Sequence, residues 1–354
     1  MKRLWRFGGL LTLGIALLIR LAFSNRGLFE SVYFQGVYPA VKSVQEWLSP
    51  MWIVPGYILL IVGVVVWLVF RFPRRWKRRD VGRFLLRAAN LAASIAAVFL
   101  LSWGYLYTGP TLVERMQLGT SDAQVEPSEL YLEVMGMAER QRSEIAGAVD
   151  SLTVIGFDPP TDEQLVCAVA RVLTPLGYPN LKSVRVRRIK PDGTLRRLGI
   201  AGIYNPFTGE ANVDDLYGAV SATFTTAHEL AHAFGVTGEG DANFVAFLAL
   251  RGMDDPMGRY AAYYTLWRHT AKTVNDSYGE EDLAAIASVI PEGLRIDRQA
   301  TAARVRGHAP YFPEVSEAVN DSYLKIQGVE AGVADYDRFV SLYLLMRERL
   351  DEGK

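Results

Sequence analysis

Residues 225–234 read TTAHELAHAF and place His228, Glu229 and His232 in the pattern His-Glu-x-x-His. In a helix, side chains four positions apart lie on one face about one turn apart, so both imidazoles can reach a single metal ion. Imidazole nitrogen suits zinc, and a catalytic zinc site needs three protein ligands and one open position for water. We therefore expect His228 and His232 to bind Zn²⁺. Glu229 is the predicted catalytic residue, which takes the proton of the metal-bound water and returns it to the leaving amine.

The same pattern could arise by chance on a surface helix, where histidine and glutamate are both tolerated. However, two of only four histidines in the chain form it. Its other residues are apolar and predict a buried helix: Leu230, Ala231, Ala233 and Phe234. Unpaired imidazoles and a carboxylate are costly in such a place unless a metal ion or hydrogen bonds satisfy them. The metal-binding interpretation is therefore favoured, whereas His269 and His308, in polar and basic neighbourhoods, are interpreted as surface or capping residues.

The third metal ligand is expected downstream of this helix. Gly235 predicts the helix end, and residues 236–238 predict a tight turn. Two acids, Glu239 and Asp241, then stand at the start of a second apolar helix that folds back beside the first. Glu239 is the predicted third ligand, and Asp241 is the competing candidate. The alternative for Glu239 is a solvated acid that interacts with the helix dipole.

Charge is unevenly distributed along the chain. The first 108 residues carry 14 Lys or Arg and only three acids. Subtraction from the 38 basic and 38 acidic residues of the whole chain leaves 24 and 35 in residues 109–354, a net charge of −11. Nucleic acid is therefore not an expected partner of this acidic part. Cys167 is the only cysteine, which excludes an intrachain disulfide and a cysteine zinc cluster.

Three apolar stretches predict transmembrane helices in the lipid bilayer, at about 7–23, 51–70 and 84–107. The alternatives are a signal peptide for the first, although no convincing small-residue cleavage site follows it, and a buried soluble helix for the third. Residues 71–83 form a dense basic loop, which the positive-inside rule places in the cytoplasm. The chain is thus predicted to be a multi-pass cell-membrane protein, with a membrane domain at 1–108 and an extracytoplasmic domain at 109–354.

The extracytoplasmic domain is expected to be mainly helical with a small sheet, an α+β fold. Helical spacing covers residues 127–152, a capping box opens another helix at residue 161, and the chain after residue 255 is helical. Alternation at 183–189 and short apolar runs at 199–204 and 210–213 predict strands directly before the His228 helix. An edge strand beside the metal could pair with an extended peptide. Tyr204 and Glu210 lie on these strands and receive no role.

Several further stretches accompany the metal motif: WGYLY at 103–107, GIYNPFTGEAN at 202–212, EGDANF at 239–244, NDSYLK at 320–325 and the helix around Tyr336. With HELAH at 228–232, they resemble domain-of-unknown-function family 3810, a bacterial membrane family with a zincin-like metallopeptidase motif. The resemblance covers most of the chain. It implies a zincin-like fold and hydrolysis but supplies no substrate.

Resemblance also suggests roles for individual residues. The pattern Glu239-x-x-Ala-Asn243 resembles the Glu-x-x-Ala-Asp of membrane-associated zinc peptidases, which implies that Glu239 binds zinc and that Asn243 supports a histidine ligand. The family usually has Glu at the position of Asp241, so either acid could be the ligand. Asn320 or Tyr323 could stabilise an oxyanion, as Tyr or His does in other zinc peptidases. A helix cap and a half-buried packing residue are the favoured interpretations of these two.

Together these features predict a membrane-anchored zinc metallopeptidase that hydrolyses peptide or protein substrates outside the cytoplasm. The alternative is a non-catalytic zinc-binding membrane sensor or scaffold protein, whose structural site would have four protein ligands. A non-peptide amide of the cell envelope is a third option, because the zinc chemistry would be the same.

Overall fold

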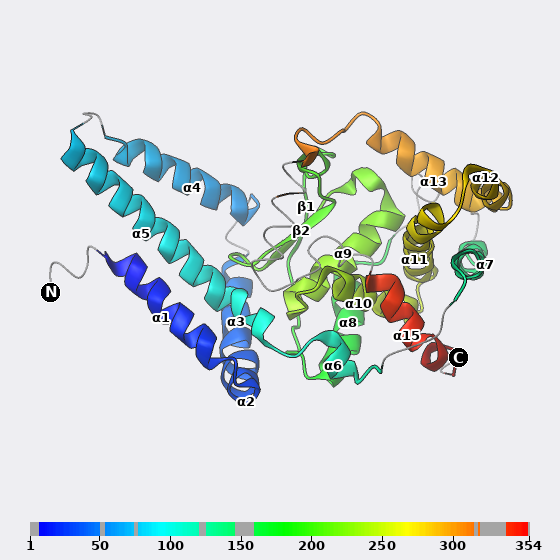
Figure 1. Ribbon diagram of the computed structural model, residues 1–354, viewed down its shortest axis with the longest axis horizontal. Coiled ribbons are helices and arrows are strands. Elements are labelled where there is room, and N and C mark those ends of the chain that lie inside the picture. The colour runs from blue at the N-terminus through cyan, green and yellow to red at the C-terminus, as the bar shows by residue number, and fades with distance from the viewer. Residues whose placement is uncertain are drawn as a thin grey trace. The chain divides into compact units, whose positions relative to one another are not determined.

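A computed structural model describes residues 7–49, 54–73, 77–119, 125–145, 159–314, 318 and 338–352. The chain forms two compact units (Figure 1). The first unit comprises residues 1–110 and 205–210, and the second comprises residues 111–204 and 211–354.

The first unit is helical. Its elements are α1 (Gly8–Ala22), α2 (Arg26–Leu28), the π-helix η2 (Phe29–Val37), α3 (Tyr38–Leu48), α4 (Gly56–Arg71), α5 (Arg78–Ser102) and the 3₁₀-helix η4 (Gly104–Thr108). Helix α1 packs along α5, where the Gly9 amide donates to Asn90 Oδ1 at 3.0 Å. A Cβ at Gly9 would overlap the Asn90 carbonyl oxygen, so this close approach requires glycine. The Tyr105 hydroxyl donates to the carbonyl of Ala16, near the middle of α1, at 2.9 Å.

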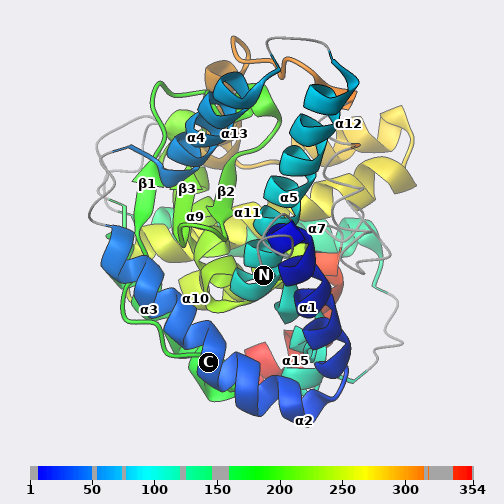
Figure 2. The same cartoon turned by 90° about the vertical axis from the view of Figure 1, so that its left-hand side faces the viewer.

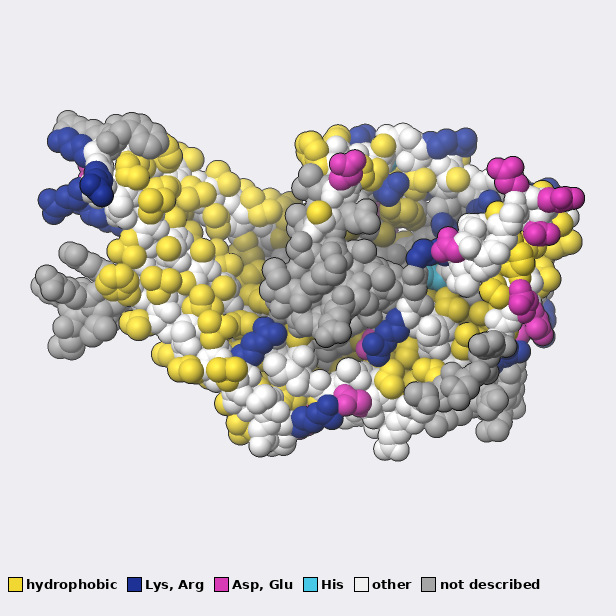
Figure 3. Space-filling view, viewed as in Figure 1, with side chains coloured by type: hydrophobic (Ala, Val, Ile, Leu, Met, Phe, Trp, Pro, Cys, Tyr) yellow, Lys and Arg dark blue, Asp and Glu magenta, His cyan; other side chains and the backbone are white. Residues whose placement is uncertain are grey.

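Apolar side chains cover much of the visible surface of these helices (Figure 3). Ile61 and Val69 of α4 and Leu85 and Val98 of α5 are all more than half exposed. Helix α5 has 25 residues and is apolar enough to cross a membrane, and α1 followed by residues 26–48 could form a second span, bent by 113°. One or two helices are thus candidates for membrane association.

The prediction of three spans before a zincin-like α+β domain is wrong in both parts. Among the described residues, α1 has 15 residues and α4 has 16, and only α5 reaches the length of a span by itself. At 1.5 Å per residue, 16 residues extend about 24 Å, short of the roughly 30 Å hydrocarbon core. The apolar stretch at 51–70 contains Pro55, which precedes the first residue of α4, Gly56. Proline disfavours helical conformation in the residue before it, so the apolar composition predicted a longer helix than the chain forms.

The second unit is also mainly helical. Its α-helices are α6 (Leu112–Met116), α7 (Pro127–Ser143), α8 (Asp162–Leu173), α9 (Ala219–Phe234), α10 (Glu239–Arg251), α11 (Pro256–Ser277), α12 (Glu280–Ser288), α13 (Glu292–Val305) and α15 (Arg338–Glu352). Its 3₁₀-helices are η5 (Thr174–Leu176), η6 (Arg196–Leu198) and η7 (Asp215–Tyr217). Helix α10 packs against α8, α9, α11 and α15, so the centre of this unit is made of helices.

The sheet is small. Strands β1 (Val186–Arg188), β2 (Gly202–Asn205) and β3 (Glu210–Val213) lie in the order β1-β3-β2, as Figure 2 shows. Val186 pairs with Ala211 in the parallel β1–β3 register. Helix accounts for 73% and strand for 4% of the structure, which contradicts the predicted α+β class. The alternating run at 183–189 pairs over only three residues, because β3 offers a partner of only four.

A buried ion pair joins α7 to α13. Arg142 Nε lies 2.9 Å from Asp297 Oδ2, and the Tyr260 hydroxyl donates to the same oxygen at 2.7 Å. We expect Asp297→Ala to lower the free energy of unfolding by about 3–5 kcal/mol, because it leaves the Arg142 guanidinium buried without its main partner. Thermal or denaturant unfolding of the full chain measures this.

The matched control is Arg295→Ala on the same helix. Arg295 pairs with Glu292 at the surface, where both side chains are more than half exposed. Exposed pairs of this kind contribute about 0–1 kcal/mol, so the control should unfold almost as the wild type does. Equal losses in the two variants would contradict the structural importance of the buried pair.

Candidate metal centre

The histidines lie in the buried C-terminal half of α9. His228 is 9% exposed, Glu229 4% and His232 7%. Helix α9 ends at Gly235, which has a left-handed φ of 110° that suits glycine. The chain then turns through residues 236–238 and starts α10 at Glu239, so α10 begins beside the last turns of α9.

Three side chains converge here. The Nε2 atoms of His228 and His232 are 3.1 Å apart, and Glu239 Oε2 lies 3.2 Å from the first and 3.6 Å from the second. Within the described part of the chain, this group could hold a metal ion, with ligand atoms that all lie within 4.8 Å of one another. The structure thus brings together the two histidines and Glu239 as predicted.

Hydrogen bonds on the far side of each ring orient both histidines. His232 Nδ1 lies 2.7 Å from the Val236 carbonyl oxygen, which can only accept, so this Nδ1 carries the proton. His228 Nδ1 lies 2.8 Å from Asn243 Oδ1, the contact predicted for Asn243. In the neutral rings, both Nε2 lone pairs therefore point with a Glu239 oxygen toward one place. Three electron-pair donors this close repel one another unless a cation lies among them.

The pKa values of His232 and Glu239 also indicate that positive charge is favoured at this centre. Burial lowers the pKa of His232, but the charges and hydrogen bond of Glu239, with Glu229 and Val236, outweigh it and raise that pKa to about 9. Burial alone would raise the pKa of Glu239, but the two histidines outweigh it and hold that pKa below its usual range. At neutral pH the metal-free centre therefore holds a proton where a metal ion would supply the charge.

This proton predicts the pH dependence of metal binding. Below pH 9 a metal ion must displace the His232 proton, so apparent affinity should fall as pH falls, by about tenfold per pH unit for one displaced proton. Competition with a metal-binding dye between pH 6 and 8 measures the slope. A slope of zero would show that no ligand is protonated in the metal-free protein.

Glu229 lies against strand β2. Its carboxylate accepts a hydrogen bond from the Tyr204 backbone amide, and a Cβ at Gly202 would come within 2.5 Å of Glu229 Oε1. Burial raises the pKa of Glu229, and the nearby Glu239 raises it further, whereas His228 and His232 lower it. The position is thus a buried carboxylate held by a strand backbone, with a stronger affinity for protons than an exposed glutamate has.

Asp241, the competing ligand candidate, has another partner. Arg338 Nε of α15 lies 3.0 Å from Asp241 Oδ1, and Asp241 does not belong to the converging group. Of the two acids, Glu239 is therefore the one that the structure brings to the histidines. Asn320 and Tyr323 lie outside the described residues, so their proposed oxyanion role stays a prediction.

The other residues considered from sequence have separate surroundings. Glu210 belongs to the first unit, where it accepts a hydrogen bond from the Gly56 amide at 2.8 Å. His269 contacts the ring of Phe339, with ring centroids 5.2 Å apart. His308 Nδ1 lies 3.3 Å from the Arg304 carbonyl oxygen. The converging group includes none of these three residues.

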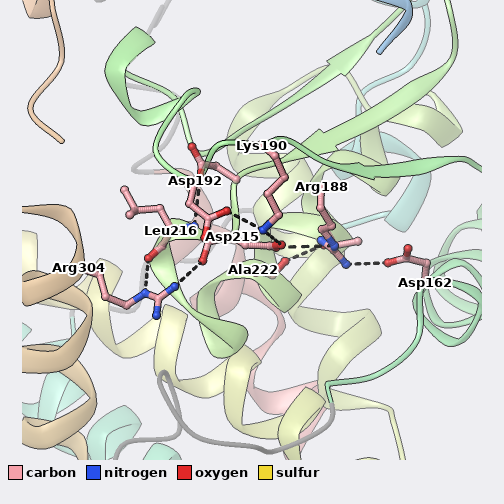
Figure 4. A network of polar contacts seen from close by, with 10 residues as sticks. Asp162, Arg188, Lys190, Asp192, Asp215, Leu216, Ala222 and Arg304 are labelled. Atoms are coloured by element: carbon pink, nitrogen blue, oxygen red, sulfur yellow. Dashed lines mark hydrogen bonds and ion pairs between the residues drawn. The ribbon is translucent and has the colours of Figure 1, made fainter. Parts of the chain in front are cut away.

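A polar network holds the middle of α9 and the short helix η7 that precedes it (Figure 4). Arg188 of β1 donates to Thr226 of α9 at 2.7 Å and pairs with Asp162 of α8 at 2.8 Å. Arg304 of α13 donates to the carbonyls of Leu216 and Asp215 in η7, which leads into α9. The helix that carries the histidines is thus tied to a strand and two other helices through side chains that do not touch the centre.

Sequence reasoning missed three contributors: the Val236 carbonyl, the Gly202 backbone and Arg338. A glycine at the start of a predicted strand is a signal of close backbone approach, and Gly202 shows this. The Val236 carbonyl left no such signal, because it is a backbone atom. Arg338 left none because it lies about 100 positions along the chain from its partner Asp241.

Comparison with known protein families matches residues 33–344 to the family described as protein of unknown function (DUF3810). The chain belongs to this family. The matched range contains the converging group and both of its supporting hydrogen bonds. No curated protein and no solved structure matches the chain.

In this DUF3810 protein, Asn243→Ala should weaken metal binding by about 10- to 100-fold, because the His228 ring loses the partner that sets its orientation and tautomer. Titration against a competing chelator measures the affinity. Asn275→Ala, at an exposed position on α11, is the matched control and should bind metal as the wild type does. Equal affinities in all three proteins would remove Asn243 from the metal centre.

Proposed function

We propose that this protein is a membrane-anchored zinc metallopeptidase that hydrolyses peptide bonds outside the cytoplasm. The observation that carries the proposal is the convergence of His228 Nε2, His232 Nε2 and Glu239 Oε2 on one place, with the buried carboxylate of Glu229 nearby. Three neutral or anionic donors and one separate carboxylate are the components of a hydrolytic metal site.

Zinc fits the separations between the donor atoms. Tetrahedral coordination at ~2.0–2.1 Å would place ligand atoms ~3.3–3.4 Å apart. The three separations are 3.1, 3.2 and 3.6 Å, close to these values before any adjustment. Two imidazoles and a carboxylate are also a ligand set that catalytic zinc sites use. A bound zinc ion would supply Lewis acidity, which polarises a carbonyl and lowers the pKa of water.

Glu229 would move the proton. Its carboxylate is 4% exposed and fixed by the Tyr204 amide, so it is held in one orientation as a general base must be. Its raised pKa helps it to keep a proton after taking one from the attacking water. Glu229 then transfers that proton to the departing amine, which leaves the carboxylate ready for the next cycle.

An extended peptide is the substrate that the surroundings favour. Strand β2 lies at an edge of the sheet, and its Gly202 backbone approaches the Glu229 carboxylate. Ile203 on this strand is 44% exposed, so the strand presents an apolar side chain as well as backbone. A peptide added to such an edge would bind through main-chain hydrogen bonds beside the catalytic group. An envelope amide with a peptide-like backbone would use the same contacts.

The basic start of α5 supports the proposed orientation. Arg78, Arg79 and Arg83 lie in its first two turns, after the basic residues of the preceding loop. The positive-inside rule would keep this end of α5 in the cytoplasm. One crossing by α5 would then put the chain after Ser102, with the metal centre, on the other side of the membrane.

Asp241 bears on the non-catalytic alternative. A structural or sensing zinc site is usually closed by four protein ligands, and Asp241 was the candidate for the fourth. Its contact with Arg338 supports three protein ligands and an open position, and hence the hydrolase.

The test uses the purified full-length protein. Zinc content is measured by mass spectrometry, and cleavage is measured on a mixed peptide library before and after a zinc chelator, with a non-chelating isomer as control. We expect one zinc per chain and cleavage that disappears with the chelator and returns with added zinc. Bound zinc without cleavage of peptides or envelope amides would favour the sensor. Absence of zinc would overturn both functions.

A further inference from the structure

The second unit contains an open cavity that is separate from the metal centre. Its volume is about 660 Å³, and it is lined mainly by α11, α12 and α13. Tyr131 of α7 and Tyr217 of η7 also reach it. Small-molecule sites typically have volumes of about 300–1,000 Å³, so this cavity is large enough for a ligand but not for a folded partner.

Helix α12 faces the cavity with an apolar stripe. Leu283, Ile286 and Ala287 follow the i, i+3, i+4 spacing of one helix face, and they line the cavity together with Ile290, which lies two residues after the end of α12. None of the residues of α12 is fully buried, although its apolar face points inward. An amphipathic helix normally buries this face against a neighbour. Here the apolar face borders open volume, and an apolar ligand would complete the packing.

Three arginines line the same cavity: Arg196 of η6, Arg268 of α11 and Arg298 of α13. No carboxylate side chain lines it, and none of the three arginines forms an ion pair within the described ranges. Residues 109–354 have a net charge of −11, and Arg142 of the same unit pairs with an acid, Asp297. The described lining of this cavity therefore carries positive charge and no carboxylate.

We infer that this cavity binds a small amphipathic anion, a single alkyl chain that carries a carboxylate or phosphate head. Guanidinium groups bind both heads with charge-assisted, often bidentate, hydrogen bonds. Arg268 and Arg298 are exposed, so they meet the head at the mouth of the cavity. The chain lies against Trp267 of α11 and the stripe of α12, which are the apolar part of the lining. Single-chain fatty acids and lysophospholipids share this chemistry.

The test is photo-crosslinking of the full-length protein in nanodiscs of zwitterionic phosphatidylcholine, since detergents are themselves amphiphiles. The probe is a fatty acid with a diazirine on its alkyl chain, and crosslinked peptides are mapped by mass spectrometry. We expect crosslinks in residues 280–305, and crosslinks in α5 measure the probe that is dissolved in the lipid.

Excess dodecanoate or dodecyl phosphate should suppress the crosslinks in residues 280–305. Dodecanol and inorganic phosphate should not, because one lacks the charge and the other lacks the chain. Stronger competition by dodecanoate identifies a fatty acid, and stronger competition by dodecyl phosphate identifies a lysophospholipid-like head.

Matched variants separate the two parts of the site. Arg268→Gln with Arg298→Gln should reduce crosslinking of residues 280–305 about tenfold or more, whereas Arg295→Gln, outside the cavity on α13, should not. Ile286→Glu should also abolish crosslinking, and Val289→Glu, outside the lining and 55% exposed, should not. Unchanged crosslinking in the double arginine variant, or equal competition by dodecanol and dodecanoate, would overturn the inference.

Discussion

Replacement of Glu229 by glutamine should lower peptide hydrolysis by about 100- to 10,000-fold while zinc stays at one per chain. Glutamine keeps the size of the side chain and can still accept from the Tyr204 amide, so the packing against Gly202 survives. It cannot take a proton from water. Because Glu229 forms no part of the converging group, the metal ligands remain in place. Initial rates on the best library peptide, with zinc content of the same samples, measure both effects.

Glu163→Gln on α8 is the matched control for this substitution. Glu163 is an exposed glutamate in the first turn of its helix, so its replacement should leave rate and zinc content unchanged. Full activity in Glu229→Gln would remove Glu229 from the mechanism. Loss of zinc together with activity would instead mean that Glu229 supports the metal ligands, and the drop in rate would then say nothing about proton transfer.

The metal centre was predictable from sequence because its parts are local. His228 and His232 are one helical turn apart, and Gly235 returns the chain so that Glu239 follows within seven residues of the second histidine. Helix periodicity and a glycine cap are short-range properties that a sequence displays directly. The choice between Glu239 and Asp241 was not local, since it depends on Arg338 from a distant helix.

The fold was harder to predict, for two physical reasons. Hydropathy measures apolar content but not helix length, and Pro55 shortens α4 within an apolar stretch. Strand alternation indicates which residues could pair but not how many find a partner. Strand β1 therefore ends after three residues. The cavity beside α12 left no sequence signal, because it depends on the spacing of three helices.

His232→Ala should abolish stoichiometric zinc binding. Removal of a supporting residue lowers metal affinity by about 10- to 100-fold, and removal of this ligand should lower it further. The substitution deletes one of three donors and leaves only two, His228 Nε2 and Glu239 Oε2, which lie 3.2 Å apart. Zinc should then stop stabilising the protein. In the wild type, free zinc at 100 times the dissociation constant raises the free energy of unfolding by about 2.7 kcal/mol. Thermal unfolding with and without zinc measures this difference.

His269→Ala is the matched control, because it removes a histidine of the same unit that lies outside the converging group. Its zinc content and zinc-dependent stabilisation should match those of the wild type. A His232→Ala protein that still gains stability from zinc would place the metal at other residues. Because a proton on His232 occupies the same position as the metal, stabilisation of the wild type by zinc should also weaken as pH falls from 8 to 6, whereas His232→Ala should show no such dependence. That difference in pH response ties the observed zinc effect to the centre that contains His232.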